Sequence, residues 1–189
     1  MKRLLAYSTI AHGGFLLAAL SIGTVTSYGA AVFYLVCYAF TNLGAFAVVV
    51  SLAHRGRDFE RVSDFAGLQR SRPGLAAAMT LFVVSLAGVP MTAGFMARWR
   101  VLASVIESGH MPLAIVSVLA TVVLFYAYLR IPISMWMQEP SGEPPRPEST
   151  TPELFVLALC AVLVLYLGAF PDALFPTLTW AQQSVEALF

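Results

Sequence analysis

The placement of charged residues constrains this chain more than any other feature of its sequence. No Asp, Glu, Lys or Arg occurs between Leu4 and Ala53, and none occurs between Pro73 and Ala97. About 20 apolar helical residues cross the roughly 30 Å hydrocarbon core of a bilayer, and both uncharged stretches exceed that length. Only 11% of the residues are charged, against roughly 25% in a soluble domain. The sequence predicts an all-α integral membrane protein that forms a single membrane domain over residues 1–189.

The interruptions between the apolar runs divide this domain into about five transmembrane helices. We expect them over residues 4–23, 29–53, 74–107, 112–137 and 152–170, joined by polar loops at 54–73 and 138–151. The second of these loops holds four prolines, which disfavour a helix. The tail over 171–189 is mildly amphipathic and is expected to lie at the membrane interface.

The third predicted helix is too long to be continuous. An unbroken helix over 74–107 would extend about 51 Å, well beyond the bilayer core. Its middle contains Gly88, Pro90 and Gly94, and proline removes a backbone donor and clashes with the preceding turn. We therefore predict one helix that is discontinuous near Gly88–Gly94, inside the membrane. Two short helices folded as a hairpin are the alternative.

Five helices place the positive charges on one side of the membrane. The N-terminus and the two polar loops carry eight Lys and Arg residues, whereas the opposite side carries none. Cytoplasmic loops are enriched in Lys and Arg, so the N-terminus is expected to be cytoplasmic and the C-terminus external. A hairpin at the third helix would instead move Arg146 to the other side.

Two ionisable residues are predicted to lie within the membrane, where such residues are costly and commonly functional. Arg98 follows the break, beside freed backbone groups and opposed half-helix dipoles. It is either an element of an ion path or a structural charge neutralised by carbonyls or by another subunit's carboxylate. His12 is a candidate for proton transfer because histidine titrates near neutral pH. A hydrogen-bonded histidine that packs between helices is the alternative.

A third set of candidates lies on the second predicted helix. Tyr34, Tyr38 and Asn42 recur at intervals of four residues and therefore share one face. Their polar groups can hold a chain of water molecules or can join neighbouring helices. The sequence shows no phosphate-binding loop, no dinucleotide fingerprint and no metal-ligand spacing, so we predict neither a catalytic residue nor a metal site. A net charge of +1 gives no support to nucleic-acid binding.

Several motifs resemble the antiporter-like membrane subunits of respiratory complex I, a family that includes Mrp-type cation/proton antiporters and membrane-bound hydrogenases. The segments that carry this resemblance are Lys2–His12, Phe33–Leu35, Asn42–Phe46, Ser85–Phe95 and Tyr126–Arg130. The second and third segments, together with Tyr38, look like subunit N of NADH-quinone oxidoreductase. Two departures are Arg98, where the family usually has lysine, and Met91, where it has a second proline.

The resemblance implies proton translocation across the cell (inner) membrane, driven by electron transfer elsewhere in the complex. It implies that this chain binds no cofactor itself, and that NADH, FMN, iron–sulfur clusters and quinone belong to partner subunits. Its partners would be the lipid bilayer, other membrane subunits and, indirectly, quinone. The likeness covers only the last five helices of a longer subunit, so a fragment, a split subunit and a remnant are all open. The alternative functions are an Mrp-type antiporter subunit and a non-catalytic packing subunit.

Overall fold

The computed structural model describes residues 2–52, 61–139 and 151–171, and every regular element in these ranges is a helix. The elements are α1 (Lys2–Ile22), α2 (Val25–Leu52), the 3₁₀ helix η1 (Val62–Phe65), α3 (Leu68–Ser71), α4 (Pro73–Ala87), α5 (Ala93–Glu107), α6 (Met111–Met137) and α7 (Thr151–Ala169). The predicted all-α class is confirmed. The expected interfacial tail beyond Pro171 lies outside the described residues, as do 53–60 and 140–150 of the polar loops.

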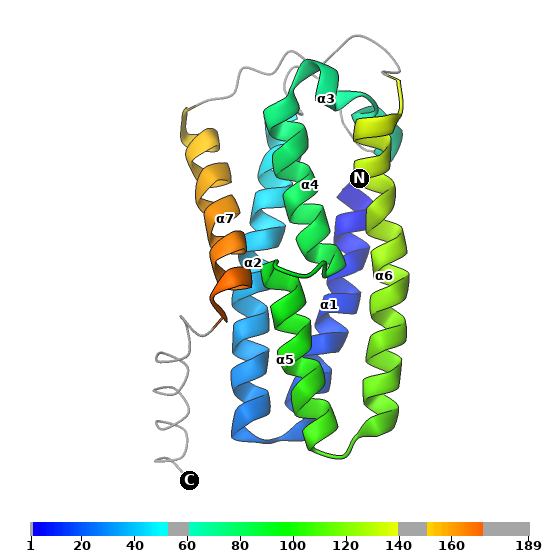
Figure 1. Ribbon diagram of the computed structural model, residues 1–189, viewed down its shortest axis with the longest axis vertical. Helices are drawn as coiled ribbons and strands as arrows, with labels where there is room; N and C mark the ends of the chain where they lie inside the picture. Colours follow the sequence, from blue (N-terminus) through cyan, green and yellow to red (C-terminus); the bar gives the residue numbers. More distant parts are fainter. Residues whose placement is uncertain (1, 53–60, 140–150, 172–189) are drawn as a thin grey trace.

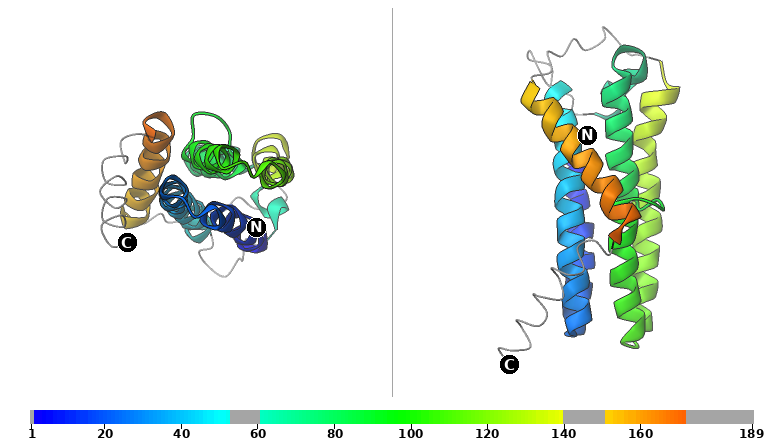
Figure 2. Two further views of the ribbon diagram at one scale, coloured as in Figure 1. Left: turned by 90° about the horizontal axis from the view of Figure 1, so that it is seen from below. Right: turned by 60° about the vertical axis from the view of Figure 1, so that its left-hand side comes forward.

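The long helices form an antiparallel bundle. Seen from one end, α1 and α2 make one layer, α4, α5 and α6 make a second, and α7 flanks α2 (Figure 2). The core between the layers includes Phe33, Met79, Phe82 and Val101, all fully buried. Within the described residues, three helices are individually long and apolar enough to cross a membrane, namely Leu4–Ile22 of α1, Val25–Leu52 and Met111–Met137.

The two half-helices α4 and α5 follow one another along the bundle axis instead of turning back (Figure 1). This arrangement confirms a single discontinuous helix and excludes the hairpin. Pro73 occupies the first turn of α4, where its missing N–H has no helical partner to lose. Gly88 ends α4 in the left-handed conformation, with φ of 84°, and Val89 N donates to Val84 O as in a Schellman motif.

The segment Val89–Thr92 joins the two half-helices. Met91 adopts a left-handed φ of 67° there, which is uncommon for a residue other than glycine. The Thr92 hydroxyl donates to Val89 O at 2.6 Å and closes the turn. Pro90 lies exposed within this segment, so the chain leaves α4 at the glycine, two residues before the proline.

The described part of the first polar loop, from residue 61 onward, differs from the expectation because some of it is helical. Phe65 and Leu68 are buried and anchor η1 and α3. The Ser134 hydroxyl of α6 donates to Val62 O at 3.2 Å, and Gly67 N donates to Ser134 O. Two apolar side chains and these contacts with α6 thus order a stretch whose composition indicated only a solvated loop.

Candidate functional site

A buried histidine joins three helices at the level of the break. His12 of α1 contacts the Tyr34 hydroxyl of α2 through Nδ1 at 2.7 Å and the Tyr128 hydroxyl of α6 through Nε2 at 3.2 Å. All three side chains are buried. A neutral imidazole has one donor and one acceptor nitrogen, so His12 accepts from one tyrosine and donates to the other. A change of tautomer reverses both roles, which is the property needed to pass a proton between α2 and α6.

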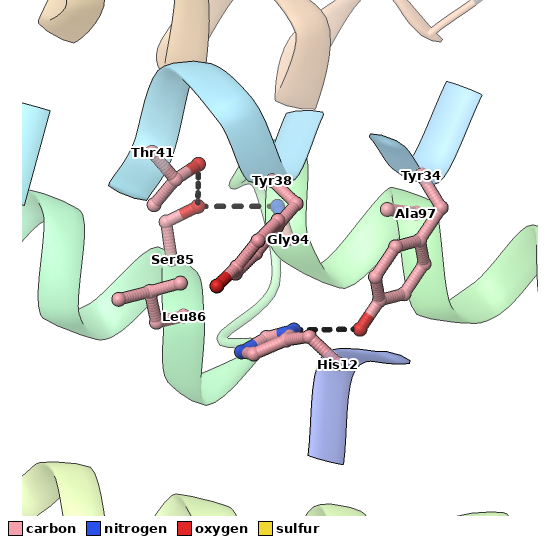
Figure 3. Close-up of a pocket in the computed structure, with 8 residues that line it drawn as sticks. All are labelled: His12, Tyr34, Tyr38, Thr41, Ser85, Leu86, Gly94 and Ala97. Carbon is pink, nitrogen blue, oxygen red and sulfur yellow. Dashed lines mark hydrogen bonds between the residues drawn. The ribbon is translucent and has the colours of Figure 1, made fainter. Parts of the chain in front are cut away.

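Tyr38 extends this cluster along α2. Its ring lies 4.5 Å from the His12 ring between centroids, and its hydroxyl contacts Thr9 Oγ1 of α1 at 2.9 Å. Tyr34 and Tyr38 both line a small cavity between α1, α2, α4 and α5, with room for about one water molecule (Figure 3). The cavity places His12 next to the discontinuous helix.

The far wall of the cavity is a second polar group, formed by Thr41, Ser85 and Gly94. Ser85 Oγ accepts from Gly94 N at 3.1 Å and lies 3.5 Å from Thr41 Oγ1 (Figure 3). Ser85 belongs to α4 and Gly94 to α5, so one hydroxyl bridges the two half-helices. Gly94 has no room for a side chain, because a Cβ there would collide with the Ser85 carbonyl.

Arg98 holds the end of α4. Its guanidinium donates to the carbonyl oxygens of Leu86 and Ala87, and the side chain is only 6% exposed. Those carbonyls are left without helical partners where α4 ends, and a cation there opposes the negative end of the helix dipole. The guanidinium also lies 5.5 Å from the Phe15 ring centroid. The sequence left two roles open for Arg98, and these contacts are those of a charge neutralised by backbone carbonyls. The same contacts place Arg98 next to the His12 cluster.

Not every candidate residue joins the site. Asn42 lies one turn beyond Tyr38 but does not line the cavity, where Thr41 takes its place. Its Oδ1 is buried without a hydrogen-bond partner among the described residues. Pro90 and Met91 lie exposed at the break. Across the ranges that the structure describes, no three His, Cys, Asp or Glu side chains gather as a metal site would require.

Tyr128 is the main functional candidate that sequence reasoning missed. It is fully buried, although most of α6 presents apolar side chains outward. It lies 116 residues from His12 in the chain, so no local spacing connects the two. The one indication in the sequence is that Tyr128 lies in the segment Tyr126–Arg130, which resembles the family. That resemblance assigns no role to the tyrosine.

Comparison with known proteins identifies the family of the chain. Residues 1–124 match the family described as NADH:quinone oxidoreductase/Mrp antiporter, TM, and the chain belongs to this family. The chain is 42% identical over 172 residues to NADH-quinone oxidoreductase subunit N 1 of Solibacter usitatus. It is also 42% identical over 176 residues to NADH-quinone oxidoreductase subunit N of Chloroflexus aggregans. These alignments cover 90% and 93% of this chain.

Solved structures show the same fold. A chain of respiratory complex I from Thermus thermophilus with bound aureothin matches 94% of this chain with a TM-score of 0.81 and 30% identity, over 40% of its own length. A chain of the Mrp complex from Dietzia sp. DQ12-45-1b matches with a TM-score of 0.79 at 19% identity, over 40% of its length. The present chain spans only 35% and 36% of the two curated relatives. The chain is a membrane-embedded member of the family.

Proposed function

We propose that this chain is part of a proton-translocating membrane subunit of an NADH:quinone oxidoreductase, of the subunit N type. In this role it couples electron transfer elsewhere in the complex to proton transfer across the membrane. The observation that carries the proposal is the buried contact of His12 with Tyr34 and Tyr128 beside the broken helix. Tyr38 and the small cavity extend the same polar group toward Ser85.

Arg98 has a different task in this proposal. Arginine stays protonated in proteins, whereas a buried lysine can release its proton. Arg98 therefore acts as a fixed charge and does not carry the proton itself. The electric field of Arg98 acts on the His12 cluster, while its guanidinium N–H groups hold the last carbonyls of α4 in place.

The proposed orientation has the N-terminus in the cytoplasm and the C-terminus outside. The start of α1, the end of α6 and α3 lie at the same end of the bundle (Figure 1). Arg61, Arg70, Arg72 and Arg130 belong to this end, whereas the short connections at 23–24 and 108–110 contain no Lys or Arg. This asymmetry supports the positive-inside assignment.

NADH, FMN, iron–sulfur clusters and quinone belong, in this proposal, to partner subunits, and this chain binds none of them. Its own contribution is to position hydroxyl, imidazole and guanidinium groups in a site shielded from water. Its partners are the other membrane subunits of the complex and the surrounding lipid, and quinone acts on it only indirectly.

A vesicle experiment tests the function as a whole. Closed membrane vesicles that contain the assembled complex are supplied with NADH, and proton uptake is recorded with and without sodium. We expect NADH-dependent proton uptake that is insensitive to sodium and is lost when this chain is deleted. Sodium-dependent proton exchange without NADH oxidation would instead establish an Mrp-type antiporter subunit. Proton uptake that survives deletion of the chain would leave it only a packing role.

A further inference from the structure

Helix α7, the last helix in the part of the chain that the structure describes, reaches the break although it lies outside the residues that match the family model. That match ends at residue 124, whereas α7 begins at Thr151. Helix α7 packs against α2, α4 and α5. It slants across the bundle, and its carboxyl end reaches the level where α4 gives way to α5 (Figures 1 and 2).

Gly168, in the final turn of α7, makes the close approach possible. A Cβ on Gly168 would lie 2.5 Å from Met91 O and 2.7 Å from Thr92 Cα. Both atoms belong to the backbone, so neither can move aside as the end of a flexible side chain would. Any other residue at position 168 must push α7 away from the break or shift the break itself.

Contacts at both of its ends hold helix α7 against the bundle, so α7 can restrain the position of the break. Its buried side chains recur every three or four residues and form one apolar stripe that runs into Gly168, made of Leu157, Cys160, Val164 and Leu167. At the other end, the Ser51 hydroxyl of α2 donates to the Glu153 carboxylate at 3.2 Å. Both ends of α7 are thus tied to the bundle.

The break needs a restraint because its backbone is strained. Met91 holds a positive φ of 67° while its side chain is 77% exposed, so its own side chain contributes little packing. Such conformations persist only where the surrounding structure fixes them. The hydrogen bond from Thr92 Oγ1 to Val89 O closes the turn from within, and the last turn of α7 presses on it from outside.

We propose that α7 is a clamp for the break, and that Gly168 is a positioning residue for proton transfer. By seating against Met91 and Thr92, Gly168 fixes the spacing between α4 and α5. That spacing keeps Ser85 against Gly94 and keeps Arg98 on the last carbonyls of α4. The inference rests on the proposed function, since it assigns α7 to the same site.

Two measurements on Gly168→Ala test the clamp. In the first, the full chain in lipid nanodiscs carries Met91→Cys with a nitroxide label, while the two native cysteines, Cys37 and Cys160, are buried at 1% exposure each. In the second, the same glycine variant in the assembled complex is assayed for protons moved per electron. We expect Gly168→Ala to change the mobility of the label and to lower the proton-to-electron ratio, because the added methyl group displaces the break.

Gly74→Ala is the matched control, since Gly74 lies in α4 with nothing within 4 Å of an added Cβ, and it should change neither reading. Leu167→Ala weakens the packing of α7 against the bundle without adding a clash. It is the second test variant, used if the complex with Gly168→Ala does not assemble. We expect it to raise the mobility of the label. An unchanged label spectrum in both variants would overturn the clamp. A changed spectrum with an unchanged proton-to-electron ratio would leave the clamp standing and would overturn the role of the break in transport.

Discussion

Arg98 is the residue whose chemistry most limits the mechanism. Its guanidinium is buried, keeps its charge and binds the terminal carbonyls of α4. The Nε atom is buried without a hydrogen-bond partner among the described residues, so the site already bears the cost of one unpaired donor. The buried charge acts on its neighbours through its electric field, and its hydrogen bonds order the backbone at the end of α4.

Replacing Arg98 by methionine should destabilise the protein. The variant keeps an apolar stem but leaves two buried carbonyls unpaired, and each such group costs about 1–3 kcal/mol. Thermal unfolding of the purified chain in nanodiscs measures the loss. Arg130→Met provides the control, because Arg130 is an exposed arginine near the end of α6. Equal melting temperatures for the two variants would show that the cap contributes nothing.

Tyr128 offers an isosteric test of the histidine cluster. Tyr128→Phe removes only the hydroxyl that contacts His12 Nε2, so the core should remain filled while the link to α6 is lost. We expect fewer protons moved per electron in the assembled complex. Tyr126→Phe, two residues away and 72% exposed, should retain the full ratio. The same ratio in both variants would remove Tyr128 from the path.

At the scale of the element, the discontinuous helix depends on close contact between its halves. Gly94→Ala would drive a methyl group into the Ser85 carbonyl and break the bond between Gly94 N and Ser85 Oγ. Overpacking of this kind costs about 1–3 kcal/mol. We expect a lower melting temperature and a lower proton-to-electron ratio, whereas Gly74→Ala should preserve both. Wild-type values for Gly94→Ala would mean that the two half-helices do not need this contact.

The sequence predicts the break but not its backbone. An apolar stretch too long for one crossing, with Gly88, Pro90 and Gly94 in its middle, indicates a discontinuous helix inside the membrane. The left-handed Met91 is not foreseeable, because nothing in its side chain favours that conformation. The helical segment from Val62 to Ser71 was missed for a related reason, since its order comes from contacts with α6 and not from its own composition.

At the scale of the whole molecule, the distribution of charge is enough to predict the bundle. Long apolar stretches separated by charged loops indicate membrane helices, and this inference needs no knowledge of side-chain packing. The candidate site is different. His12 meets Tyr128 across 116 residues of chain, and Gly168 meets Met91 from another helix. Such pairs depend on how helices rotate and tilt against one another, which hydropathy does not encode.

The proposed orientation can be tested by labelling from each side of the membrane. Ser63→Cys and His110→Cys introduce thiols at exposed positions near opposite ends of the bundle. A membrane-impermeant thiol reagent applied to intact cells should label position 110 and spare position 63. Inverted vesicles should give the reverse, with labelling of this chain followed by mass spectrometry. Labelling of position 63 from outside would contradict the assignment.

The proposed proton path runs through the cluster of His12, Tyr34 and Tyr128 beside the fixed charge of Arg98. Its most direct test is the number of protons moved per electron by the assembled complex in sealed vesicles, compared between wild type and His12→Ala. We predict a lower ratio for His12→Ala, a lower ratio for Arg98→Ala and an unchanged ratio for His110→Ala, whose side chain is exposed. An unchanged ratio in His12→Ala, with the complex assembled and oxidising NADH at the normal rate, would contradict a proton path through this cluster.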